Sequence, residues 1–82
     1  LRLATQPALA GIKHCNRLEQ VLARAEWRDS GIDEGLMRDA DGDVVCATAA
    51  NVFVLRDDRW WTPPVDRCGV AGVCRAWALP AL

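Results

Sequence analysis

Lys13 is the residue whose chemistry stands out in this sequence, because it is the single lysine beside nine arginines. An amine can form a Schiff base with a carbonyl compound, whereas a guanidinium stays protonated and is a poor nucleophile. Residues 9–12 before it are apolar or small, and Asn16 with Glu19 predicts a helix start shortly after it. Both surroundings favour a nucleophilic amine. On spacing alone, a solvated surface lysine is the simpler interpretation.

A second candidate site is the segment GVAGVCR, residues 69–75. A glycine-containing loop that opens a helix is typical of an anion site, since free backbone N–H groups and the helix dipole point at the ligand. Gly72 would let a ligand approach the backbone, and Val73 and Cys74 would present the N–H groups. The segment is not a Walker loop, because no G-K-[ST] follows. An ordinary junction between a loop and a helix is the alternative.

A third candidate is the segment CATAAN, residues 46–51, where small residues leave room for a bulky group against the backbone. A tightly packed pair of strands would explain the same composition. Taken together, a Schiff-base lysine, a small-residue strand and a phosphate loop indicate one cofactor, pyridoxal 5′-phosphate.

The elements that must position these residues follow from periodicity and turn signals. Apolar residues at helical spacing predict a helix from Asn16 to about Arg28. Asp41-Gly42 predicts a hairpin turn within a meander of strands, and a second helix is expected over 73–79. The order helix, antiparallel strands, helix predicts an α+β (mixed α/β) fold. The strands are expected at 34–39, from 44, at 51–56 and at 59–62.

Composition limits the partners of the chain. The 82 residues carry a net charge of −1 with both signs interspersed, which disfavours binding to nucleic acid or to an anionic membrane. Four cysteines without a C-x-x-C pair disfavour a metal site, so we expect none, and predict reduced, mostly buried thiols. The first residue is Leu1 and the last helix is cut short, so we expect a fragment of a longer chain.

Most of the sequence resembles one enzyme family. The run LAGIKHCNRLEQVLARAEW, with DEGLMRDADGDVV, AANVFVL and TPPVDRCGVAGVCR, is similar to aminodeoxychorismate lyases. These belong to the fold-type IV pyridoxal-phosphate enzymes, together with branched-chain and D-amino acid aminotransferases. The resemblance extends from about residue 9 to residue 79. The pattern K-H-x-N-R-L-E-Q is specific to the lyase branch, whereas the aminotransferases share a looser K-x-x-N pattern.

The resemblance implies a role for each candidate residue. Lys13 matches the catalytic lysine that binds the cofactor covalently and later moves protons. The backbone amides of Val73 and Cys74 match the phosphate-binding positions, and Val70 matches an apolar residue near the cofactor ring. The segment that lines the cofactor before the next strand is matched by Ala49, Ala50 and Asn51.

Cys46 is the departure from the family pattern. The family usually places a glutamate five residues before the asparagine of this segment, where its carboxylate pairs with the pyridine nitrogen. A thiol is a poor substitute for that carboxylate. We therefore expect Cys46 to bind the cofactor in the glutamate position, with a less firmly protonated ring nitrogen.

The resemblance implies the conversion of 4-amino-4-deoxychorismate to 4-aminobenzoate and pyruvate, a step in folate synthesis. Residues 1–82 would form part of the C-terminal cofactor-binding domain of a cytoplasmic homodimer, without the N-terminal small domain and the C-terminal strands. Two alternatives stay open: a fold-type IV aminotransferase, and a non-catalytic fragment or interaction module. The isolated fragment is expected to be inactive.

Overall fold

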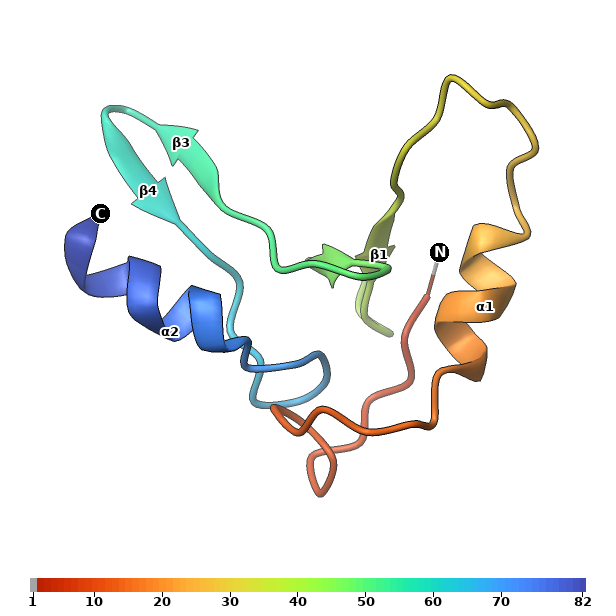
Figure 1. Cartoon of the computed structure of the whole chain (residues 1–82). Coiled ribbons are helices and arrows are strands. Elements are labelled where there is room, and N and C mark those ends of the chain that lie inside the picture. The colour runs from red at the N-terminus through yellow and green to blue at the C-terminus, as the bar shows by residue number, and fades with distance from the viewer. Residues whose placement is uncertain (1) are drawn as a thin grey trace.

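A computed structural model describes residues 2–82 (Figure 1). The chain forms two short helices and two antiparallel hairpins, so the predicted α+β class and the order helix, strands, helix are confirmed. The strands pair as β1 with β2 and β3 with β4, in two separate sheets rather than one meander. The elements are α1 (Leu18–Arg24), β1 (Leu36–Arg38), β2 (Val44–Ala47), β3 (Val54–Arg56), β4 (Arg59–Trp61), α2 (Val73–Ala78) and the 3-10 helix η1 (Leu79–Ala81).

Helix α1 begins later and ends earlier than its pattern predicts. Its N-cap is Arg17, and the predicted capping box of Asn16 with Glu19 is wrong. The Glu19 carboxylate accepts a hydrogen bond from Ala4 N at 2.6 Å instead, and Asn16 N donates to His14 Nδ1 at 3.1 Å. The helix ends at Arg24 rather than near Arg28, because the chain turns away toward Ser30-Gly31.

The first hairpin contains the core of the molecule. Gly42 adopts φ 89° in the predicted turn between β1 and β2, a conformation that suits glycine. Met37 of β1 is fully buried and pairs with Cys46 of β2. The buried apolar residues around them form one cluster, made of Leu3, Ala23, Met37, Val45, Cys46 and Cys68.

The second hairpin differs in its turn and in its burial. Asp57 and Asp58 both adopt positive φ, at 52° and 60°, as a two-residue turn of type I′ requires. Every residue of β3 and β4 is exposed, including Trp60 and Trp61. The apolar side chains of the hairpin are only about half covered, with Val54 and Trp61 facing a cavity that Val45 and Pro63 also line.

Figure 1 shows two arms that rise from a common base of loops. The first arm contains α1, β1 and β2, and the second arm contains β3, β4 and α2. The radius of gyration is 13.0 Å, against about 12 Å for a compact chain of this length. The accessible surface is 6092 Å², against about 4900 Å² for a compact monomer of this mass. The arms therefore leave more surface open than a closed domain would.

Candidate functional site

The segment before Lys13 is bound to the predicted phosphate loop through the backbone. Gly11 N donates to Gly69 O at 2.9 Å, and Ala71 N donates to Gly11 O at 3.0 Å. These bonds form an isolated parallel bridge between Gly11 and Val70. Lys13 itself is exposed and lies two residues after the bridge. The structure thus brings two sequence-predicted site segments together although more than 50 residues separate them.

Asn51 joins the third predicted segment to the same loop. Its Nδ2 donates to Val70 O at 2.8 Å, and its Oδ1 lies against the backbone of Gly72. A side chain at Gly72 would overlap Asn51 Oδ1, so this contact requires glycine. The requirement for Gly72 comes from Asn51, whereas the sequence pattern suggested a ligand as the reason. Ala49 and Ala50 are exposed in the turn before Asn51.

The start of α2 offers backbone donors to a ligand. Gly72 is the N-cap with extended backbone angles, and Val73 and Cys74 are both exposed in the first turn. The first N–H groups of a helix have no intrahelical acceptor. The sequence of this turn contains no acidic residue, and within residues 2–82 no side chain caps it. The donors of Val73 and Cys74 therefore suit the phosphate of the predicted cofactor.

Thr48 is the centre of a polar cluster that sequence reasoning missed. It is fully buried, at 2% exposure. Arg17 NH2 donates to Thr48 O at 2.7 Å, and Arg24 NH1 donates to Thr48 Oγ1 at 3.0 Å. The hydroxyl donates to Glu34 Oε1, and Thr48 N donates to the same carboxylate oxygen at 3.2 Å. Both ends of α1 are thus held to the turn that leads to Asn51.

Glu34 is the acidic member of this cluster. The hydrogen bond from the Thr48 hydroxyl, followed by one from Gly35 N, lowers the pKa of the Glu34 carboxyl below its usual value. Arg24 NH1 lies 3.8 Å from the same carboxylate and adds to the effect. In the sequence, the only sign of this cluster was a threonine among alanines, which is too weak a signal to predict it.

Cys46 is buried on β2, at 7% exposure. Its side chain belongs to the apolar core, where burial, then the nearby Cys68, raises the pKa of its thiol. A buried neutral thiol cannot replace a carboxylate that faces a ring nitrogen. The expectation of mostly buried cysteines is half right: all four are free, but Cys15 and Cys74 are exposed.

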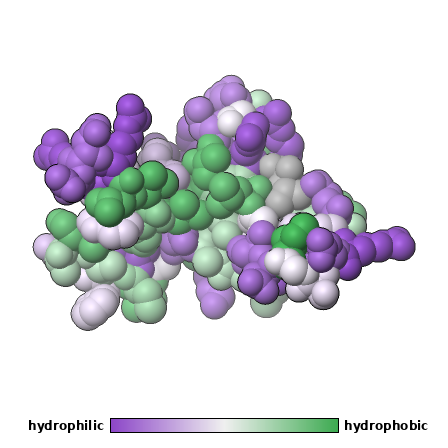
Figure 2. All heavy atoms as spheres, turned by 90° about the horizontal axis from the view of Figure 1, so that it is seen from above, coloured by the Kyte–Doolittle hydropathy of each residue, from purple (hydrophilic) through white to green (hydrophobic). Residues whose placement is uncertain are grey.

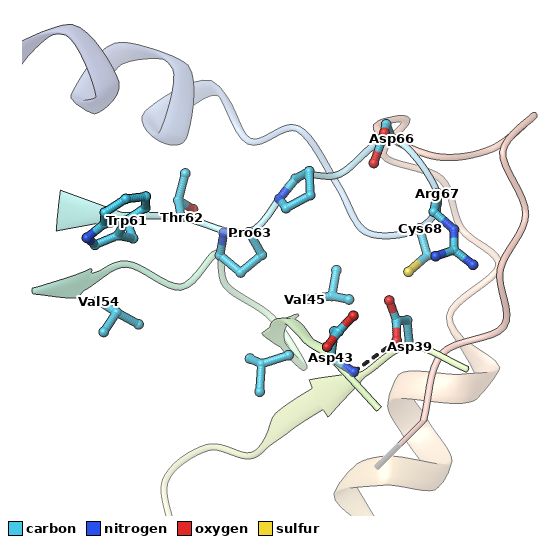
Figure 3. A pocket seen from close by; sticks show the side chains of 12 residues that line it. Asp39, Asp43, Val45, Val54, Trp61, Thr62, Pro63, Asp66, Arg67 and Cys68 are labelled. Carbon is cyan, nitrogen blue, oxygen red and sulfur yellow. Dashed lines mark hydrogen bonds between the residues drawn. The ribbon is translucent and has the colours of Figure 1, made fainter. Parts of the chain in front are cut away.

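A cavity of about 460 Å³ is lined by residues other than the predicted cofactor residues (Figure 3). Val45, Trp61 and Pro63 give it apolar walls, and three aspartates also line it. The carboxylate of Asp39, a buried residue, accepts hydrogen bonds from its own hairpin, including one from Asp43 N at 3.0 Å (Figure 3). The lining contains none of the eight predicted site residues, all of which the structure describes. We therefore do not assign the cofactor to this cavity.

Comparison with known proteins identifies the family. The sequence profile of the amino-transferase class IV family matches residues 1–82. The chain belongs to this family. The Lys13 segment and the glycine loop with which it pairs therefore both lie within the residues that match this family.

Individual relatives show which enzymes of this family the chain is similar to. The chain is 42% identical over 81 residues to the aminodeoxychorismate lyase of Vibrio harveyi, covering 99% of this chain and 30% of that protein. It is 38% identical over 65 residues to branched-chain-amino-acid aminotransferase-like protein 2 of Arabidopsis thaliana, covering 79% of this chain and 11% of that protein. The chain spans about 30% of the length of the lyase it matches.

A solved structure supports the fold. The crystal structure of 4-amino-4-deoxychorismate lyase from Pseudomonas aeruginosa matches with a TM-score of 0.92 and 55% identity, over 98% of this chain and 30% of that chain. The similarity to a lyase of this fold that the sequence indicated is confirmed. Within residues 2–82, no helix has the length and apolar character needed to cross a bilayer.

Proposed function

We propose that this chain is the cofactor-binding part of a pyridoxal-phosphate-dependent lyase that converts 4-amino-4-deoxychorismate to 4-aminobenzoate and pyruvate, a step in folate synthesis. The observation that supports it most is the backbone pairing of Gly11, two residues before Lys13, with the loop at Val70. The exposed Lys13 follows this pairing by two residues on one segment, and the exposed Val73 and Cys74 follow it by three and four on the other. The relatives named as lyases support the same reaction.

Pyridoxal 5′-phosphate needs partners for its aldehyde, its phosphate and its ring nitrogen, and the residues present fit the first two. Lys13 would bind the cofactor's aldehyde, and the N–H groups of Val73 and Cys74 would hold the phosphate, with Val70, Ala49 and Ala50 beside the ring. When bound, the cofactor supplies an electron sink for the carbon that loses a proton. Cys46 does not fit the third point, the ring nitrogen, because burial raises the pKa of its thiol and a neutral thiol offers that nitrogen no negative charge.

Lys13 is the residue that moves protons in this proposal. Its Nζ would take the proton from the amine-bearing carbon of the substrate. The enol-pyruvyl group leaves as the ring becomes aromatic, and Lys13 Nζ, or another group, returns a proton to the departing pyruvate. Aromatisation drives this elimination, so it depends less on a carboxylate at the ring nitrogen than transamination does.

The proposal extends to the whole protein. The catalytic unit is a longer chain, in which further residues recognise the substrate carboxylates, and it acts as a cytoplasmic homodimer. Residues 1–82 alone are inactive, because the small domain and the C-terminal strands are absent from them. The lengths of the relatives support this, since the chain covers 30% of the lyase sequence.

The test is chemical labelling of the full-length protein. We expect the protein with added cofactor, reduced with borohydride and digested, to carry the label on Lys13. Lys13→Arg should abolish the label and the release of pyruvate and aminobenzoate. A label on another residue, or none, would overturn the proposal.

A fold-type IV aminotransferase is the second candidate, favoured by the 38% identity to an aminotransferase-like protein. The two are separated by products: pyruvate and aminobenzoate from one substrate, against amino transfer to an added oxo acid. The K-H-x-N-R-L-E-Q run favours the lyase. A Cys46→Glu variant adds a second test, since an unchanged cofactor spectrum and rate would mean that position 46 does not reach the ring.

A further inference from the structure

Both flanks of Lys13 are tied into one ring of hydrogen bonds. On the preceding side, Gly11 uses both its N–H and its carbonyl on the glycine loop, at 2.9 and 3.0 Å. On the following side, Arg17 NH2 donates to Thr48 O at 2.7 Å. Lys13 lies between these two anchors, two residues from one and four from the other.

The ring closes through the CATAAN turn. Ala47 N donates to Ala50 O at 2.8 Å, which turns the chain from Thr48 toward Asn51. Asn51 Nδ2 then donates to Val70 O at 2.8 Å, and Val70 is the partner of Gly11 in the parallel bridge. The path therefore runs from Lys13 through Arg17, across to the CATAAN turn, and back through the glycine loop.

The anchors differ in how firmly the fold holds them. Thr48 is 2% exposed and receives arginine donors from both ends of α1, while its own N–H and hydroxyl donate to Glu34. Burial and these hydrogen bonds together hold Thr48 in one position. Lys13 is exposed, so its own side chain has no packing to define its place. Position must come from the backbone on either side of it.

We propose that Arg17 and Asn51 are positioning residues for Lys13, Arg17 fixing the backbone after it and Asn51 fixing the loop that pairs before it. The proposal rests on the proposed function, in which Lys13 reacts with the cofactor. It assigns Asn51 to the carbonyl of Val70 rather than to the cofactor. A well-placed amine reacts faster at equal affinity, since misplacement by about 1 Å can cost 100-fold in rate.

The experiment uses the full-length protein freed of cofactor and mixed with pyridoxal phosphate. Two quantities are measured: the affinity for the cofactor, and the rate at which the absorbance band of the Lys13-linked cofactor forms. For Arg17→Met and Asn51→Asp, we expect the rate of band formation and kcat to fall at least tenfold, with cofactor Kd and substrate KM within threefold. Arg28→Met is the matched control, an exposed arginine beyond α1, and should behave as the unaltered protein.

The variant Arg17→Lys distinguishes a positioning role of Arg17 from a purely electrostatic one. It keeps the positive charge but not the planar guanidinium, so we expect an intermediate rate of band formation, whereas a purely electrostatic role would give the original rate. If Arg17→Met does not fold, the nearly isosteric Asn51→Asp decides the test. Unchanged rates in Asn51→Asp and Arg17→Lys would overturn this inference while leaving Lys13 labelled. Absence of any label on Lys13 in the unaltered protein would overturn the proposed function, and this inference with it.

Discussion

The two arms of the molecule differ in how they are held together. In the first arm, Met37 and Thr48 are fully buried, and arginines from α1 bind the turn after β2. In the second arm, every residue of β3 and β4 is exposed, and Trp77 of α2 is 80% exposed. Figure 2 shows hydrophobic residues gathered over the left and centre of the face seen from above.

This difference separates an arm with a buried core from one in which every strand residue is exposed, although α1 in the first arm also exposes Leu18, Val21 and Leu22. An exposed apolar patch of this kind is unusual for a monomer and marks a surface that contacts something else. The relatives offer a physical reason, since they contain about three times as much chain.

The first prediction compares one buried and one exposed apolar side chain. Met37→Ala should lower the free energy of unfolding of the 82-residue chain by about 2–5 kcal/mol, because it leaves a cavity in the core. Trp77→Ala, at 80% exposure, should change it by less than about 0.5 kcal/mol. Denaturant titration measures both. Equal effects would remove the distinction between the arms, and a large Trp77→Ala effect confined to the full-length protein would show that further chain covers the second arm.

The second prediction concerns the contact that joins the arms at their base. Gly72→Ala should cost about 1–3 kcal/mol, because the new methyl group overlaps Asn51 Oδ1. In an Asn51→Ala background the same change should cost less than half as much, which a double-mutant cycle by thermal unfolding measures.

Gly31→Ala is the control for this cycle. Its methyl group would meet only the flexible Asp29 side chain, at 3.2 Å, so we expect a change within about 0.5 kcal/mol. Additive effects of Gly72→Ala and Asn51→Ala would contradict the proposed contact.

The third prediction is a pH dependence within the first arm. The pKa of Glu34 is lowered on folding, so the carboxylate contributes stability above its unfolded value, about pH 4.3, and loses it as the pH falls through the folded value. The side chain is one-third exposed and screened by solvent, so we expect about 1 kcal/mol. Unfolding midpoints between pH 6 and 3 measure it.

Glu34→Gln should remove the loss of stability that Glu34 causes at acid pH. The control Asp33→Asn, at an exposed position, should leave that loss unchanged. If both substitutions flatten the pH profile equally, the hydrogen bonds of Glu34 with Thr48 are not its source.

The smallest predicted effect lies in the hairpin of the second arm. Asp58→Gly should raise stability by about 0.5 kcal/mol, because glycine adopts the observed φ of 60° without steric cost. Asp66→Gly, at a position outside the left-handed region, should lower it instead. Thermal unfolding of both variants measures the difference, and a loss of stability in Asp58→Gly would mean that the turn is not of type I′.

Local signals in the sequence predicted the elements but not their ends. Asp41-Gly42 specified the first turn and the apolar run after residue 16 specified a helix, because turn chemistry and periodicity act over a few residues. The capping box failed because Glu19 binds the distant Ala4 N, a contact that no local pattern can reveal. The burial of Cys46 could not be predicted either, since burial depends on what packs over a strand.

The sequence by itself determined the family, the lone lysine and the glycine loop, because these depend on residue types and short spacings. Only the tertiary structure decided that Gly11 pairs with Val70, that Asn51 requires glycine at position 72, and that Thr48 holds both ends of α1. These contacts join residues 21 to 59 positions apart. Such distances are set by packing and backbone pairing of the whole chain, and no local preference encodes them.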